Sequence, residues 1–209
     1  MRIVIICEGK TEKAFKDCLL RFLKSRFLEL RPETKMPKLV FDVHNGPIPK
    51  EDKLSRVVTN LLNAKQNPAD AVIALADVYP DFVDAQDAKS KMRQWVGKQP
   101  AFFPHVALHD FEAWLLPYWD QIRKLSKQLN AAPFGSNPET VNHHNPPAHR
   151  MRRLFEAGKC RDSYDKPRDA GRILKDADLM IAIKKCPELK AFVNTILKLC
   201  DPTTVIPWH

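Results

Sequence analysis

Long apolar runs are missing from this sequence of 209 residues. No stretch approaches the roughly 18 apolar residues that a membrane-spanning helix requires, so we expect no membrane partner. The apolar run at residues 1–7 is short and leads at once into Glu8, Lys10 and Glu12, which favours a strand over a signal peptide. We therefore expect a cytoplasmic protein.

Paired cysteines and glycine-rich phosphate loops are missing as well. The five cysteines (Cys7, Cys18, Cys160, Cys186 and Cys200) are odd in number, scattered and without a CxxC pair, so they indicate neither a disulfide framework nor a zinc site. No P-loop and no GxGxxG pattern occurs, which disfavours a nucleotide-binding or phosphotransfer enzyme.

The chain is basic, and its charge is unevenly distributed. The formal net charge is +9, with the basic excess in residues 1–40 and 147–209 and a nearly neutral stretch between them. Hydrophobic residues make up 44% and charged residues 28%, which is typical of a globular domain. A basic excess of this size is the electrostatic pattern of a nucleic-acid-binding protein, although a solvated basic surface explains it equally simply.

The first 115 residues predict a parallel sheet. Short apolar runs alternate with longer segments of helical period, as in βαβ units. We predict strands at residues 2–7, 39–44, 71–77 and 104–109. The helices between them are predicted at residues 11–30, 50–66 and 84–97. The first helix places Phe15, Leu19, Phe22, Leu23 and Phe27 on one face, which is the apolar stripe of a helix that covers a sheet.

The rest of the chain predicts helices and no further strand. We expect helices at residues 111–129, 148–157, 169–185 and 187–199, with a proline-rich loop at residues 130–147. The length favours one domain, 1–209, made of a sheet core (1–115) and a helical C-terminal extension (116–209).

Acidic residues follow three of the predicted strands. In a parallel α/β sheet ligands bind outside the carboxyl ends of the strands, so these residues are candidates for a site. Glu8 and Asp77 each end an apolar strand, where a carboxylate is costly without a partner. Oxygen ligands of this kind suit Mg²⁺ or Mn²⁺. The candidates are Glu8, Glu12, Asp77, Asp81, Asp110 and Glu112.

Each candidate also has a plain structural role to weigh. Thr11 is expected to cap the first helix, and Glu12 to favour its positive end. Asp81 beside Pro80 suits a turn. A solvated helix is likewise the simple explanation for the basic segment, which is the best candidate for phosphate contacts. That segment contains His149, Arg150, Arg152, Arg153, Lys159, Arg161, Lys166, Arg168 and Arg172.

Several segments carry a resemblance to a known family. The stretch IICEGKTEKAF resembles the opening TOPRIM motif, in which a strand, an acidic residue and a glycine lead into a helix. In order along the chain, ALADVYPDF, HDFEAWLL, NPPAHR and YDKPRDAG, together with the pair Cys186-Pro187, make it similar to a prokaryotic TOPRIM-like family of unknown function, related to the TOPRIM domains of OLD-type nucleases.

The resemblance implies a TOPRIM-type, Rossmann-like fold with a Mg²⁺ or Mn²⁺ site for phosphodiester chemistry. It implies Glu8, Asp77 and Glu112 as catalytic residues and metal ligands, with Glu12 and Asp110 as further ligands and Lys166 as a cation for the phosphate. His149, Arg150, Arg152, Arg153, Lys166 and Arg168 would bind nucleic acid. The usual second motif is Asp-x-Asp, whereas Tyr79 stands two residues after Asp77 here, which puts a second metal in doubt.

Two functions therefore compete. The first is a divalent-metal-dependent nuclease that acts on DNA or RNA in phage defence, with a protein partner such as an ATPase. The second is a non-catalytic nucleic-acid-binding or regulatory module, which Tyr79 favours. Because one fold hosts many chemistries, the choice depends on whether the carboxylates converge.

Overall fold

The computed structural model describes residues 1–159 and 163–208. Cys160 and Arg161, which the sequence analysis named, lie outside the described residues. Within the described part, no helix is both long and apolar enough to cross a membrane.

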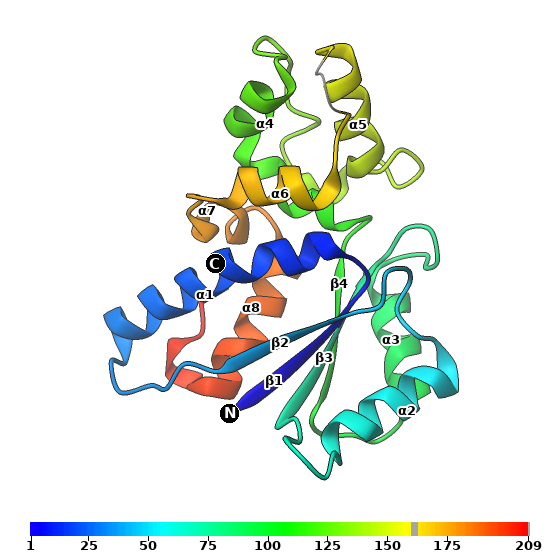
Figure 1. Ribbon diagram of the computed structural model, residues 1–209, viewed down its shortest axis with the longest axis vertical. Helices are drawn as coiled ribbons and strands as arrows, with labels where there is room; N and C mark the ends of the chain where they lie inside the picture. The colour runs from blue at the N-terminus through cyan, green and yellow to red at the C-terminus, as the bar shows by residue number, and fades with distance from the viewer. Residues whose placement is uncertain (160–162, 209) are drawn as a thin grey trace.

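A four-stranded parallel sheet forms the centre of the molecule (Figure 1). The strands stand in the order β2-β1-β3-β4, with β1 and β3 inside and β2 and β4 at the edges. The inner strands are buried on both faces, which explains their nearly continuous apolar sequences. The strands span β1 Arg2–Cys7, β2 Lys38–Val43, β3 Ala71–Asp77 and β4 Phe102–Ala107.

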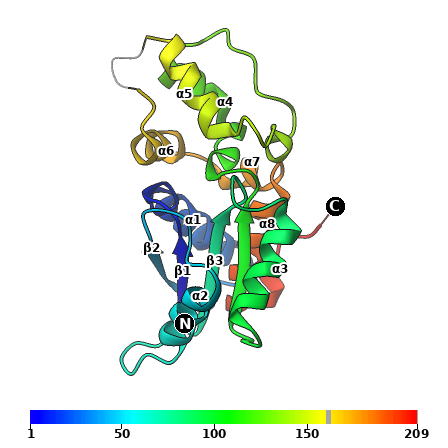
Figure 2. The ribbon, with the colours of Figure 1, turned by 90° about the vertical axis from the view of Figure 1, so that its right-hand side faces the viewer.

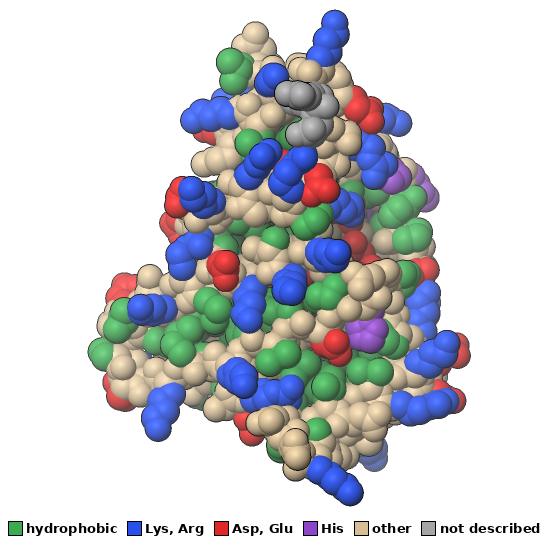
Figure 3. Space-filling view, viewed as in Figure 1, with side chains coloured by type: hydrophobic (Ala, Val, Ile, Leu, Met, Phe, Trp, Pro, Cys, Tyr) green, Lys and Arg blue, Asp and Glu red, His purple; other side chains and the backbone are tan. Residues whose placement is uncertain are grey.

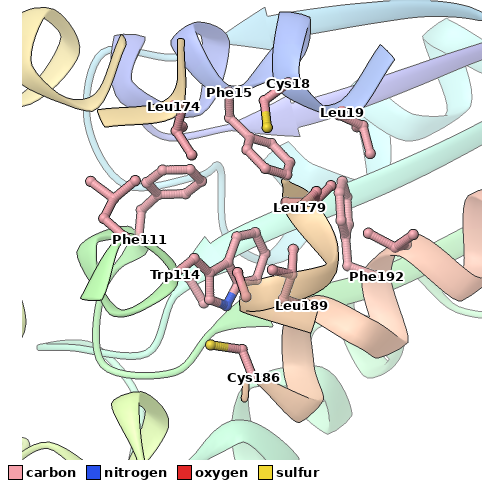
Figure 4. Close-up of a cluster of buried hydrophobic side chains, with 14 of the residues drawn as sticks. Phe15, Cys18, Leu19, Phe111, Trp114, Leu174, Leu179, Cys186, Leu189 and Phe192 are labelled. Carbon is pink, nitrogen blue, oxygen red and sulfur yellow. The ribbon is translucent and has the colours of Figure 1, made fainter. Parts of the chain in front are cut away.

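The side chains of the inner strands alternate between two cores. Ile3 and Ile5 of β1 point into the larger core beneath α1 and α8, whereas Val4 and Ile6 point into the smaller core beneath α2 and α3. Figure 4 shows part of the larger core, where Phe15 of α1 packs against Trp114 and Phe192 of α8 is fully buried beside them. The helices are α1 Lys10–Leu30, α2 Glu51–Leu62, α3 Ala85–Val96 and α8 Pro187–Cys200.

A helical portion stands beyond the carboxyl ends of the strands (Figures 1 and 2). It begins directly after β4 and returns to the sheet through α8. Its elements are the short 3-10 helices η1 Phe111–Trp114, η2 Leu116–Tyr118 and η3 Pro138–Thr140, and the helices α4 Trp119–Ser126, α5 Pro147–Ala157, α6 Lys166–Leu174 and α7 Leu179–Ile183; a 3-10 turn, η4 Pro202–Thr204, follows α8.

The predicted α/β fold class is confirmed, but two of the predicted helices are wrong. Residues 111–129 form η1, η2 and α4 instead of one helix, because Pro117 has no N–H to continue a regular ladder. Residues 169–185 are also divided: α6 ends at Leu174, and α7 starts afresh after Asp178, whose carboxylate accepts the N–H of Met180.

Smaller corrections concern the ends of elements. The second strand begins and ends one residue earlier than predicted, and the fourth strand two residues earlier. His109 and Asp110 therefore lie in the bend after β4, and neither belongs to the strand. The helix predicted at residues 50–66 ends at Leu62. Thr11 does not cap α1, because Gly9 is the N-cap and the Glu12 carboxylate accepts the Gly9 N–H at 3.3 Å.

Candidate metal and phosphate site

Carboxylates from three neighbouring strand ends gather at the rim of the sheet beneath the helical portion. Glu8 follows β1, Asp77 ends β3, and Asp110 and Glu112 follow β4, while Glu12 stands in the first turn of α1. We refer to these five side chains as the carboxylate cluster. Glu12, Asp110 and Glu112 are buried, and Glu8 and Asp77 lie partly exposed at the rim.

The members of the cluster act on one another electrostatically. Burial raises the pKa of Asp77 well above its usual value, and the negative charges of the other four members of the cluster raise it further. A nearby negative charge disfavours a second one, so all four add to the cost of ionising Asp77.

The pKa values of the other members are also raised. Burial raises the pKa of Glu8 to about 7, with the charges of Glu12 and Asp81 adding to the effect. Burial, followed by the charge of Glu112, raises the pKa of Asp110 to about 8. Burial and the charge of Glu112 raise that of Glu12. Raised values of this kind mark a site that favours the arrival of positive charge.

Backbone hydrogen bonds fix the rim carboxylates. Glu8 Oε1 accepts the N–H of Asp77 at 3.0 Å, which ties the end of β1 to the end of β3. Asp110 Oδ2 accepts the N–H of Ala148 at 3.0 Å, in the first turn of α5. That bond places the positive end of α5 against the cluster. Asp110 Oδ1 is buried and has no hydrogen-bond partner within the described residues.

The YDKPRDAG segment supplies the cluster with a cation and a hydroxyl group. Lys166 Nζ lies 3.2 Å from Glu112 Oε2, and the Tyr164 hydroxyl donates to Glu112 Oε1 at 3.2 Å. Burial alone would lower the pKa of Lys166, but the charges of Glu112, Asp77 and Asp110 outweigh it and hold the pKa above its ordinary value. Lys166 therefore stays charged beside Glu112.

The basic residues of the helical portion divide into two groups. Arg152 and Arg153 are exposed on α5, and His149 is exposed near its start, so all three are available to a ligand. Figure 3 shows Lys and Arg side chains over the viewed face of this portion. Arg150 instead donates to the Asn145 carbonyl at 3.0 Å.

Arg168 belongs to the structural group. Its Nε donates to Asp169 Oδ1 at 3.0 Å, and its Nη2 lies 2.9 Å from Asp169 Oδ2, a carboxylate that is fully buried. The N–H of Asp165 also donates to Asp169 at 2.9 Å. These bonds hold the segment that presents Tyr164 and Lys166, so the structure gives Arg168 a role in building the site.

Sequence reasoning missed a group of rings beside the cluster. His109 Nδ1 and His143 Nδ1 lie 3.1 Å apart, and the ring of Tyr79 packs against both His143 and His149. His109 adopts a left-handed φ of 71° at the turn after β4, a conformation that costs energy for a residue with a side chain. Tyr164 was missed too, although it stands two residues before Lys166 in a segment that the sequence had singled out.

The arrangement of the side chains limits the number of protein ligands that one metal ion could have. Among residues 1–159 and 163–208, no three His, Cys, Asp or Glu side chains stand close enough to hold an ion between them. A protein cage of three or four ligands, as zinc uses, therefore does not fit. Mg²⁺ commonly takes one or two carboxylates and completes its shell with water and phosphate oxygens, so it would need no more than a pair of these side chains. Asp81 forms an ion pair with Lys50 at 2.9 Å, and its charge also helps to raise the pKa of Glu8.

Comparisons with known proteins agree with the fold. The profile of a family described as a domain of unknown function, DUF4276, matches residues 7–197. The C-terminal region of the Burkholderia pseudomallei OLD protein superposes with a TM-score of 0.52 at 13% identity, over 97% of this chain and 98% of that one. The C-terminal region of the Xanthomonas campestris pv. campestris OLD protein superposes with a TM-score of 0.50 at 13% identity, over 97% of this chain and 93% of that one. No curated protein matches the chain.

Proposed function

The chain belongs to the DUF4276 family, and we propose that it is a divalent-metal-dependent nuclease whose Mg²⁺ or Mn²⁺ is held at the carboxylate cluster. The observation that carries this proposal is that Glu8, Asp77 and Asp110 stand at neighbouring strand ends, where the charges of Glu8 and Asp110 help to raise the pKa of Asp77. Such a concentration of negative charge is unfavourable until a cation arrives. The OLD-like fold and the TOPRIM-like segments of the sequence support the same chemistry.

Glu8 and Asp77 are the proposed ligands, because both are partly exposed at the rim and are tied to each other through the Asp77 N–H. When bound, the cation supplies positive charge to the phosphoryl group and to the attacking oxygen.

The other residues of the site orient the substrate. Lys166 holds a positive charge beside Glu112, where it can neutralise a phosphate oxygen. The exposed Arg152 and Arg153 lie on α5, whose first turn touches the cluster through Ala148, and they are the proposed contacts to the nucleic-acid backbone.

A metal titration tests the proposal directly. We expect calorimetry to show Mg²⁺ and Mn²⁺ binding to the natural protein and no binding to the variant Glu8→Gln, Asp77→Asn. The control variant Glu29→Gln, Glu156→Gln removes two exposed carboxylates far from the cluster and should bind like the natural protein. Cleavage of single-stranded and duplex DNA and of RNA should then require the metal and disappear in the first variant only.

One observation favours a non-catalytic nucleic-acid-binding module instead. Lys166 already supplies a cation to Glu112, so part of the cluster is neutralised without any metal. If neither metal binds and the protein still binds nucleic acid, the module is the correct function and the nuclease proposal is wrong.

A further inference from the structure

A groove of about 620 Å³ runs along the outer edge of the sheet, away from the carboxylate cluster. We call it the edge groove. It lies where α3, β4 and α8 meet, at the side of the sheet seen in Figure 2. The lining residues that matter below are Lys89 and Arg93 of α3, Pro104 and His105 of β4, Lys198 of α8, and Trp208.

The edge groove and the carboxylate cluster are separate sites. The groove is lined by the first four residues of β4, whereas the cluster lies beyond the carboxyl end of that strand, at Asp110 and Glu112. A ligand in the groove therefore does not have to contact the cluster, and the two sites can be tested independently.

The groove has a positive potential. Arg93 and Lys198 are exposed, and neither forms an ion pair with any residue that the structure describes. Lys89 is also a cation, paired with Glu188 at the margin. The pKa of His105 is lowered to about 3, first by burial and then by the charges of Lys89 and Arg93, so both cations act inside the groove.

An aromatic side chain stands at the end of the groove. Trp208 is 61% exposed, which is unusual for the largest apolar side chain, and Lys190 Nζ lies 4.6 Å from the centre of its ring. A positive groove with an exposed ring is the arrangement that binds single-stranded nucleic acid, because phosphates contact the cations while a base stacks on the ring.

A peptide strand fits this edge poorly. The Ala101 carbonyl accepts the N–H of Val72 in β3, and the Ala107 carbonyl accepts the N–H of Val78 just after β3, so by the alternation of a strand Pro104 directs its backbone away from β3. Proline has no N–H to donate, and it interrupts the edge at the point where an added strand would pair. The charges, not the free backbone, therefore decide what the groove recognises.

We propose that the edge groove binds a single-stranded segment of nucleic acid, with backbone phosphates on Arg93 and Lys198 and a base stacked on Trp208. The identity of the ligand rests on the proposed function; the site itself does not. A nuclease with such a groove would hold a strand at a second point, remote from the cluster.

The test measures binding in EDTA, so that no cleavage occurs and the metal plays no part. The probe is a fluorescein-labelled oligothymidylate longer than the roughly 4–16 nucleotides that a groove of this kind covers. We expect Arg93→Ala, Lys198→Ala to weaken binding on the order of tenfold and to lower the slope of log K against log salt by about 1.4, since each phosphate contact on a single strand contributes about 0.7.

A matched variant separates the groove from general charge. Lys24→Ala, Lys65→Ala removes the same charge from two exposed positions outside the groove and should leave the salt slope unchanged. The oligonucleotide should also quench tryptophan fluorescence, and Trp208→Phe should remove most of that quenching, because Trp114 and Trp119 are buried and the half-buried Trp95 packs against Phe82 and does not line the groove.

Three outcomes would overturn the assignment: equal salt slopes in the two double variants, quenching that Trp208→Phe leaves undiminished, or equally tight binding of a duplex through the same residues. Failure of the proposed function looks different. In that case metal binding and cleavage are absent while the oligonucleotide still depends on Arg93, Lys198 and Trp208.

Discussion

Replacing Glu8 by glutamine should make the metal-free protein more stable at pH 8. Glu8 carries a charge that the fold resists, since burial and neighbouring carboxylates raise its pKa from 4.5 to about 7. Glutamine keeps the oxygen that accepts the Asp77 N–H at 3.0 Å, so the local hydrogen bond survives the change. The substitution therefore removes the charge and also changes the contact of the side chain with the Ile48 backbone.

The magnitude follows from proton linkage. Below pH 4.5 the Glu8 side chain is protonated in both the folded and the unfolded chain, and it contributes nothing to the pH dependence. Between pH 4.5 and 7 the unfolded chain loses its proton first, so the folded state becomes progressively less favourable, and above pH 7 the full penalty is present. A pKa difference of this size corresponds to about 3 kcal/mol in the free energy of unfolding.

Urea unfolding in EDTA at pH 4 and pH 8 measures this effect. We expect Glu8→Gln to raise the free energy of unfolding relative to the natural protein by up to about 3 kcal/mol more at pH 8 than at pH 4. The control is Glu29→Gln, at an exposed position on α1. Because the protein carries a net charge of +9, removing a negative charge there should give no gain.

A result in the opposite direction would refute the electrostatic reasoning. If Glu8→Gln is no more stable than the natural protein at pH 8, the cluster does not carry the repulsion that the metal proposal needs. Added Mg²⁺ gives a second comparison, since it should stabilise the natural protein and leave Glu8→Gln nearly unchanged.

Three further changes test the surroundings of the site and the core by urea unfolding. Lys166→Met should lower the free energy of unfolding by about 1–3 kcal/mol, which is less than for a fully buried pair because the Lys166 side chain is 41% exposed. Adding Glu112→Gln to this variant should restore most of that loss. If the double variant shows no recovery, the ion pair contributes nothing to stability. Asp169→Ala should lower the free energy of unfolding by about 2–4 kcal/mol, since it removes the buried carboxylate that pairs with Arg168. An unchanged urea midpoint would contradict the role given to the bonds between Asp169 and Arg168. Phe192→Ala should cost about 3–5 kcal/mol with no change in the urea slope, whereas a loss below about 1 kcal/mol would show that α8 is not part of the core.

Local patterns in the sequence predicted the sheet well. The apolar runs of β1 and β3 match the predicted residues 2–7 and 71–77, because a strand buried on both faces leaves an uninterrupted signal. The helix after β1 was predicted within one residue at its start. Beyond β4, the helices predicted at residues 148–157 and 187–199 match α5 and α8 within one residue. The other two were wrong, since Pro117 and the capping Asp178 break long apolar segments that read as continuous.

The candidate site, like the fold, was predictable from the sequence only in part. That carboxylates would stand at one sheet edge followed from Glu8 and Asp77 ending apolar runs, since parallel strands share their carboxyl edge. Their mutual effect on pKa could not be derived, because it depends on distances across the rim. The approach of His109 to His143 likewise depends on how the loop after residue 130 folds back.

The sequence by itself therefore determined the strands, the side of the sheet on which acidic residues gather, and the basic character of the chain, because each of these is written in neighbouring residues. The tertiary structure alone decided that Lys166 and Tyr164 meet Glu112 across 54 and 52 residues, and that α3, β4 and α8 enclose a positive groove. The physical reason is that side-chain periodicity acts over a few residues, whereas these contacts arise only when distant segments bury their apolar faces against the same sheet.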